Sequence, residues 1–140
     1  GIVEYIYLNI VDEVNERLLQ YNCEDVTIEL LADLLLPVLW QHKEEAHIIF
    51  GSQLPFRLIG PISDRTWKWA EKHFNSLIKK HGLANYFTAQ ELLRYFNAQL
   101  ITVLTLWLEA DIPIAYEKFR PKFIFFMSTP INELIFKGTK

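Results

Sequence analysis

The feature that most constrains this chain is the segment YFNAQLITVLTLWLEAD at residues 95–111. Within it, residues 100–108 carry no polar group other than the hydroxyls of two threonines. A helix at the surface of a soluble protein usually buries one apolar stripe and exposes a polar face on its other side. A helix formed by this segment must instead be covered on most of its sides.

On a helical wheel, the apolar residues of this segment occupy roughly two-thirds of the circumference, which is far wider than a single stripe. The remaining strip is charged at its ends, at Glu91 and Glu109, and small and uncharged in its middle. Small side chains permit close approach by a second helix. The wide arc is centred on Leu92, Tyr95, Phe96, Gln99, Leu100, Val103, Leu106 and Trp107.

Two explanations for this excess of apolar surface stay open. The helix either runs through the core of one chain, or a second copy of the chain covers part of it. The segment FIFFM at residues 123–127 favours the second explanation, because its apolar side chains point to both sides of the next helix. Two such helices paired across a two-fold axis would form a four-helix interface. The residues expected at this homodimer interface are Ala98, Thr102, Val103, Thr105, Leu106, Phe119, Phe123, Ile124 and Phe125.

The whole chain is predicted to be all-α. Apolar residues recur at helical spacing, glycine is scarce, and the alternation typical of strands is nearly absent. A chain of 140 residues has the size of one domain. We therefore expect a single domain, residues 1–140, folded as a bundle of five to six helices. The five main helices are expected over residues 2–21, 26–51, 63–81, 88–110 and 114–128.

Local signals predict where these helices begin, bend and end. Pro37 lies inside the second helix and should kink or break it, because proline lacks a backbone donor and crowds the preceding turn. The segment GSQLPFRLIGP at residues 51–61 should end that helix. Gly82 is placed to cap the third helix, and Thr88 and Glu91 have the spacing of a capping box for the fourth.

Charge and cysteine content exclude several classes of protein. The net charge is −3, and the Lys and Arg excess in the second half of the chain is spread over several segments, unlike the clustered cationic surface that binds nucleic acid. The single cysteine, Cys23, excludes an intrachain disulfide framework and suits a reducing compartment such as the cytoplasm. No signal peptide or membrane span is expected.

Catalytic and metal-binding patterns are missing from the sequence. His42 and His47 are five residues apart, and His73 and His81 are eight apart, which are not the spacings that place two imidazoles over one metal on a helix. Cys23 precedes two acidic residues that would raise its pKa, and no nucleophile elbow or phosphate-binding loop is present. We expect no catalytic residues, no metal, no cofactor and no enzyme activity.

Two polar residues interrupt the apolar stripes and are candidates for contact with a ligand. His42 and Gln99 each lie among apolar neighbours, where a polar group is either satisfied inside the core or orients a bound molecule. Trp69 lies on the polar face of its helix and either covers a loop, covers an upstream segment or is exposed. The candidate ligand-binding residues are His42, Trp67, Phe74, Tyr95 and Gln99.

Three segments taken together resemble a known family. They are LLLPVLWQHKEEAHIIFGS at residues 34–52, IKKHG at residues 78–82, and YFNAQLITVLTLWLEADIPIAYEKF at residues 95–119, followed by a last aromatic helix. Their order and character, over about residues 2–135, resemble the C-terminal regulatory domain of TetR-family transcriptional regulators. The likeness is greatest to the branch related to dihydroxyacetone kinase regulators.

This resemblance implies a function in transcription regulation. It implies a homodimer formed by the last two long helices, a pocket for a small apolar or amphipathic effector among the middle helices, and a helix-turn-helix domain upstream of Gly1. DNA would be bound only through that upstream domain. The alternatives are a helical protein-interaction module without a small ligand and, with least support, a helical-bundle enzyme.

Overall fold

Helices account for 77% of the structure, a computed structural model that describes residues 1–137, and these residues contain no strand. The all-α prediction is therefore confirmed. Six of the α-helices have seven or more residues, and two short ones follow α3 and α7. The elements are α1 (Ile2–Leu18), the 3-10 helix η1 (Cys23–Asp25), α2 (Ile28–Gln41), α3 (Lys43–Phe50), α4 (Leu54–Arg57), α5 (Ile59–Lys80), α6 (Ala89–Leu108), α7 (Tyr116–Ser128) and α8 (Ile131–Ile135).

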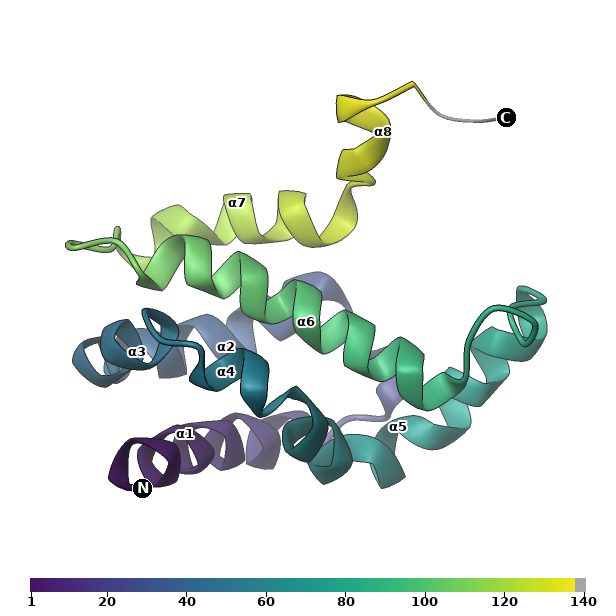
Figure 1. Cartoon of the computed structure of the whole chain (residues 1–140), viewed down its shortest axis with the longest axis horizontal. Coiled ribbons are helices and arrows are strands. Elements are labelled where there is room, and N and C mark those ends of the chain that lie inside the picture. The colour runs from purple at the N-terminus through teal and green to yellow at the C-terminus, as the bar shows by residue number, and fades with distance from the viewer. Residues whose placement is uncertain (138–140) are drawn as a thin grey trace.

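Helix α6 lies between the N-terminal and C-terminal parts of the fold (Figure 1). It packs against α5 along one side and α7 along the other, and it also contacts α3 and α4. Helix α2 passes behind it and joins α1 to α7. The hydrophobic core therefore runs from α1 through α2 and α3 to α6 and α7.

The caps of α5 and α6 are formed as their sequences predict. Gly82 has a φ of 63°, which glycine adopts without a steric penalty, and the next amide, that of Leu83, donates to the Ile78 carbonyl at 2.9 Å. At the start of α6, the Glu91 amide donates to Thr88 Oγ1 at 3.1 Å, and the Thr88 amide donates to Glu91 Oε1 at 2.9 Å. This reciprocal pair is the expected capping box.

Removing the Thr88 hydroxyl tests how much the capping box contributes to the stability of the fold. Thr88→Ala should lower the free energy of unfolding by about 1 kcal/mol, because the Glu91 amide loses its acceptor. For a chain of this length, thermal unfolding should shift down by about 4 °C. Thr88→Ser keeps the hydroxyl and should unfold close to the wild-type temperature; an equal loss in both variants would contradict the assignment of the effect to the cap.

The second predicted helix is divided, but Pro37 does not divide it. Pro37 lies inside α2, and the break comes at His42, whose φ of −107° and ψ of 34° are not helical. Proline leaves the carbonyl of Asp33, four residues earlier, without its helical donor. Asp33 is exposed, so water can satisfy that carbonyl and the helix continues. A break at Pro37, one of the two outcomes expected there, is therefore wrong, and the division lies five residues later.

The third predicted helix begins earlier than expected. Helix α5 starts at Ile59, and Pro61 lies in its first turn, where backbone amides have no partner within the helix. The short helix α4 occupies part of the segment that was expected to be irregular. Both differences arise because proline, although a helix breaker in the interior, is compatible with a first turn.

A column of stacked aromatic rings fixes α6 and α7 to α2. The Trp107 ring stacks on Trp40 with centroids 6.1 Å apart and on Phe119 with centroids 4.8 Å apart. The Trp107 indole donates to the Ile114 carbonyl at 2.8 Å, and Lys43 Nζ lies 4.7 Å from the Trp40 ring. Such pairs add to the free energy gained from burial alone.

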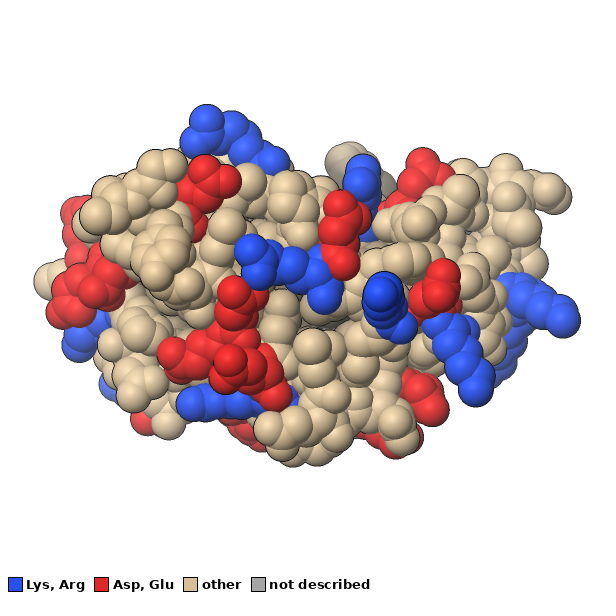
Figure 2. Space-filling view, turned by 90° about the horizontal axis from the view of Figure 1, so that it is seen from below, with Lys and Arg blue, Asp and Glu red and all other residues tan. Residues whose placement is uncertain are grey.

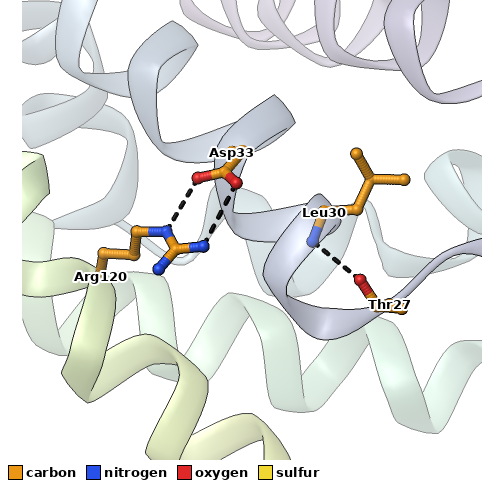
Figure 3. A network of polar contacts seen from close by, with 4 residues as sticks. All are labelled: Thr27, Leu30, Asp33 and Arg120. Carbon is orange, nitrogen blue, oxygen red and sulfur yellow. Dashed lines mark hydrogen bonds and ion pairs between the residues drawn. The ribbon is translucent and has the colours of Figure 1, made fainter.

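A polar contact fastens α7 to α2 at the surface (Figure 3). Arg120 Nε donates to Asp33 Oδ1 at 2.8 Å, and Arg120 Nη2 donates to Asp33 Oδ2 at 3.2 Å. Two parallel bonds of this kind fix the orientation of both side chains. In the same view, Thr27 Oγ1 accepts from the Leu30 amide at 3.0 Å, so Thr27 is the N-cap of α2.

Candidate ligand cavity and exposed apolar face

The apolar stretch of α6 is covered on one side by its own chain. Leu106 is 56% exposed and Thr102 is also exposed, whereas Leu100 and Thr105 are half-buried. The other five residues of the stretch are buried. They are Ile101, Val103, Leu104, Trp107 and Leu108. Residues 1–137 of a single chain therefore hide one side of α6 and leave the other uncovered.

The residues expected at a dimer interface fall into two groups. Val103, Phe119 and Phe123 are 7%, 3% and 0% exposed, so they lie in the core of the chain and are not available to a partner in this fold. Phe119 and Phe123 belong to the core because α7 packs against α2 and α6, and Val103 belongs to the same core from α6 itself. The remaining six are exposed or half-buried and lie where a partner can reach them. They are Ala98, Thr102, Thr105, Leu106, Ile124 and Phe125.

We call the uncovered side of α6, formed by Tyr95, Ala98, Gln99, Thr102 and Leu106, the outer face. The Thr102 hydroxyl donates to the Ala98 carbonyl at 2.9 Å, within its own helix. Thr105, at the edge of this face, donates in the same way to Ile101 at 2.8 Å. Their hydroxyl protons are thus used within the helix, which makes the middle of the outer face less polar than its sequence indicates.

Exposed apolar side chains continue into the C-terminal helices. Helix α7 lies beside α6, and α8 stands at its far end (Figure 1). Phe125 of α7 is 50% exposed. The other exposed apolar residues of this region are Phe126, Leu134, Ile135 and Phe136. Exposed apolar groups of this number on one part of a molecule usually mark an interaction surface.

The opposite side of α6 borders a cavity of about 270 Å³. Helix α6 contributes Leu93, Phe96, Asn97, Leu100, Ile101 and Leu104 to its lining. Helix α1 forms another wall with a stripe that includes Tyr7, Ile10 and Val14, and α2 adds Leu31 and Leu35. Helix α5 completes the enclosure with Ile62, Thr66, Trp69, His73, Phe74 and Leu77. No Asp, Glu, Lys or Arg among residues 1–137 lines it.

Two polar contacts join the walls formed by α1 and α5. The Trp69 indole donates to the Tyr21 carbonyl at 2.7 Å, so Trp69 covers the loop after α1. Arg65 of α5 donates to Asp12 of α1 through an ion pair whose side chains are both more than a third exposed. Figure 2 views this side of the molecule, where acidic and basic side chains are interspersed. Exposed pairs of this kind contribute little stability, so this wall is held only weakly at its rim.

The titratable groups of the lining include two that burial keeps uncharged. Burial raises the pKa of the Tyr7 hydroxyl. Burial and, secondarily, the Glu24 carboxylate raise the pKa of the Cys23 thiol to about 11. A thiol in this state is a poor nucleophile and a poor metal ligand. The cavity therefore offers a binding surface and no activated nucleophile at Cys23.

Alkylation measures the state of this thiol directly. At pH 8, about one molecule in a thousand should carry the Cys23 thiolate, so native protein should react slowly with iodoacetamide. The rate should rise about tenfold for each pH unit up to pH 10. Protein unfolded in urea is the control and should react much faster, since an unperturbed cysteine has a pKa of about 8.5. A native rate that equals the unfolded rate would contradict the raised pKa.

The five candidate ligand-binding residues do not converge on this cavity. Phe74 lines it, whereas Trp67 lines a separate polar pocket together with Asp64, Glu91 and Arg94. Tyr95 is 62% exposed, and Gln99 is exposed beside it on the outer face.

His42 has a polar partner of its own. Its Nε2 lies 3.2 Å from Glu13 Oε1 of α1, and both side chains are about a third exposed. The imidazole therefore has a polar partner within the protein, but it lies at the edge of the fold and not inside the core, as the first interpretation had placed it. Gln99, the second polar residue that interrupts an apolar stripe, lies on the outer face of α6 instead.

Sequence reasoning missed Asn97, the polar residue of α6 that does line the cavity. Its side-chain amide donates to Ser63 Oγ of α5 at 2.9 Å. Ser63 is 2% exposed, so this contact is buried where α5 and α6 pack. The spacing of Asn97 from Leu93, Leu100 and Leu104, four, three and seven residues, is the signal that places it on the inner side of the helix.

Comparisons with protein-family models, curated proteins and solved structures found no match to this chain. Within residues 1–137, no three His, Cys, Asp or Glu side chains come together in a way that could hold a metal ion. In the same part of the chain, no helix has the length and apolar character needed to span a membrane. The function is accordingly inferred from the cavity, the outer face and the sequence resemblance.

Proposed function

We propose that this chain is the effector-sensing and homodimerisation domain of a TetR-like transcriptional regulator. A small molecule binds in the cavity between α1, α2, α5 and α6. A second copy of the chain covers the outer face of α6 together with exposed residues of α7. DNA is bound by a helix-turn-helix domain encoded upstream of residue 1, whose hold on the operator depends on cavity occupancy.

The observation that carries this proposal is the position of α6. Its inner side lines an apolar cavity through Leu100 and Leu104, and its outer face exposes Tyr95 and Leu106. A helix with apolar groups on both sides accounts for the stretch without charged residues at 100–108. A cavity of this composition supports ligand binding, because small-molecule sites are mostly apolar with a few placed polar groups.

The shared helix also supplies a physical route for regulation. Helix α6 is a single rod of 20 residues, and Trp107 and Phe119 stack it firmly on α7. A ligand that prefers one position of this rod shifts the population toward the dimer arrangement in which the rod has that position. The shift cannot exceed the difference in affinity of the ligand for the two arrangements.

Sedimentation velocity and native mass spectrometry test the proposal together. We expect a particle with twice the mass of the chain. It should retain or take up one small molecule for each of its two chains. A dimer that binds no small molecule would favour the alternative of an interaction module. A monomer at micromolar concentration would remove the proposal. A reading frame upstream of residue 1 that encodes no helix-turn-helix would remove its DNA-binding part.

A further inference from the structure

The charge character of the cavity restricts what it can hold. Its lining includes 26 residues, of which His73 is the one histidine and none among residues 1–137 is Asp, Glu, Lys or Arg. Burial also raises the pKa of the Tyr7 hydroxyl and of the Cys23 thiol further above neutrality, so neither is charged at pH 7. An ionised group that enters such a cavity leaves water without gaining an opposite charge, which is strongly unfavourable. The occupant must therefore be uncharged where it is enclosed.

The size of the cavity sets the size of the occupant. An apolar cavity of about 150 Å³ is known to hold benzene, which has six non-hydrogen atoms. By proportion, a cavity of 270 Å³ accommodates roughly eleven non-hydrogen atoms. The occupant is thus considerably smaller than a dinucleotide or an acyl-coenzyme A.

The lining of the cavity extends along two helices. It extends over twelve residues of α1, from Tyr7 to Leu18, and over twelve residues of α6, from Leu93 to Leu104. Each of these stretches is about 16 Å long, because an α-helix rises about 1.5 Å per residue. Both helices run along the long axis of the molecule (Figure 1). A length of this order with so small a volume favours an unbranched chain over a fused ring system.

Two polar residues of the lining, Asn97 and Thr66, lie where α5 and α6 pack, whereas Asn15 and Thr27 lie on the walls formed by α1 and α2. Asn97 donates its side-chain amide to Ser63 Oγ, and no group among residues 1–137 donates to Asn97 Oδ1. Thr66 lines the cavity beside it and uses its proton on the Ser63 carbonyl at 3.4 Å. Both side chains thus retain free acceptor oxygens. A hydroxyl group of the occupant can donate to them.

We propose that the cavity binds an uncharged, unbranched aliphatic alcohol of about eleven non-hydrogen atoms, whose hydroxyl donates to Asn97 Oδ1. Its chain extends along α6 from Asn97 toward Leu104 and Phe50, among side chains that are mostly apolar. This inference rests on the proposed function, because it takes the cavity to be the effector site. It adds the chemical class of the effector and the residue that recognises its polar end.

Three compounds that differ only in their head group test the charge requirement. They are 1-decanol, decanoate and decylammonium, each used at pH 7 below the concentration at which it aggregates, with binding measured by isothermal titration calorimetry. 1-Decanol should bind at least tenfold more tightly than either ion. Decanoate or decylammonium binding as tightly as 1-decanol would overturn the inference and leave the proposed function standing.

A cavity-filling variant shows where the alcohol binds. Leu100→Trp places a larger side chain in the cavity and should reduce 1-decanol affinity at least tenfold. Tyr86→Trp is the control, because Tyr86 is 79% exposed in the loop before α6 and adds the same indole outside the cavity. Equal affinity in both variants, each folded by circular dichroism, would place the alcohol elsewhere and overturn the inference.

The ratio of the affinities for 1-decanol and for its methyl ether tests the role of Asn97, because a general loss of stability does not change this ratio. Wild-type protein should prefer 1-decanol to its methyl ether, which has no hydroxyl proton, by about fivefold to tenfold. Asn97→Leu should abolish this preference, whatever its effect on the two affinities separately. A preserved ratio would remove Asn97 from the recognition of the hydroxyl.

Failure of this inference is distinguishable from failure of the proposed function. If none of the three compounds binds and native mass spectrometry finds a different small molecule in the protein, only the alcohol inference fails. If none binds and the protein takes up no compound from a chemically diverse set, the inference and the effector-sensing role both fail.

Discussion

Replacing Phe123 by alanine is expected to lower the free energy of unfolding by about 3–5 kcal/mol. Phe123 is completely buried, and its ring contacts Phe119 at the junction of α7 with α2 and α6. Truncation removes a large apolar side chain and leaves a void that the surrounding helices fill only in part. A loss of this size is a large fraction of the stability of a typical domain.

Urea denaturation followed by circular dichroism measures this effect. Phe125→Ala is the matched control, because Phe125 lies two residues further along α7 and is 50% exposed. It should change the free energy of unfolding by less than about 1 kcal/mol. If Phe123→Ala left the unfolding midpoint unchanged but altered the oligomeric state, Phe123 would belong to an interface and the observed core would be wrong.

The second large effect is expected on self-association. Leu106→Glu should weaken the proposed dimer by more than about 100-fold, because Leu106 lies on the outer face of α6 and is 56% exposed. In an interface with two-fold symmetry each substitution occurs twice, so two carboxylates lose water without gaining a partner. The fold of each chain should persist, since this side chain is not part of the core.

Analytical ultracentrifugation over a concentration series gives the dissociation constant. Ile48→Glu on α3 is the matched control, since it makes the same kind of change at a residue that is 63% exposed on another helix. The dissociation constant of this variant's dimer should equal that of the wild-type dimer. Equal weakening by both variants would indicate a general effect of charge, and no weakening by Leu106→Glu would place the outer face of α6 outside the interface.

Helix termini could be predicted from this sequence because their causes are local. The capping box of Thr88 and Glu91 and the glycine cap at Gly82 each depend on groups within a few residues of one another. The break at His42 has no comparable local signal, and the imidazole of His42 contacts Glu13, 29 residues away. The spacing of apolar residues continues through both Pro37 and His42, so it did not reveal which of them divides the helix.

The candidate site was harder to predict for a related reason. Helix α6 has apolar residues on nearly all sides, so its wheel has no clear polar face that would orient it. Gln99 and Asn97 are both single polar residues among apolar ones, yet the first is outside and the second lines the cavity. Spacing places Asn97 on the same side of the helix as Leu93 and Leu104, but only the packing of α5 on α6, which brings Ser63 to Asn97, shows that this side meets the cavity.

The wheel also did not fix how α6 and α7 are oriented in the fold. This explains why some residues that were expected at the dimer interface lie in the core. Val103 was expected to face a partner because it belongs to the wide apolar arc of α6, but α6 turns it inward. Phe119 was also expected at the interface, although it stacks on Trp107 inside the fold. Sequence periodicity predicts which residues share a side of a helix, but not what that side meets.

The position of Trp69 makes occupancy of the cavity visible to optical spectroscopy. The chain has four tryptophans, of which Trp69 alone lines the cavity among the described residues, while its indole nitrogen is held by the Tyr21 carbonyl. A molecule that displaces water from this ring changes the polarity that the excited indole experiences. Replacing Trp69 by phenylalanine would identify its share of the emission, so that filling of the interior can be followed in real time without an attached dye.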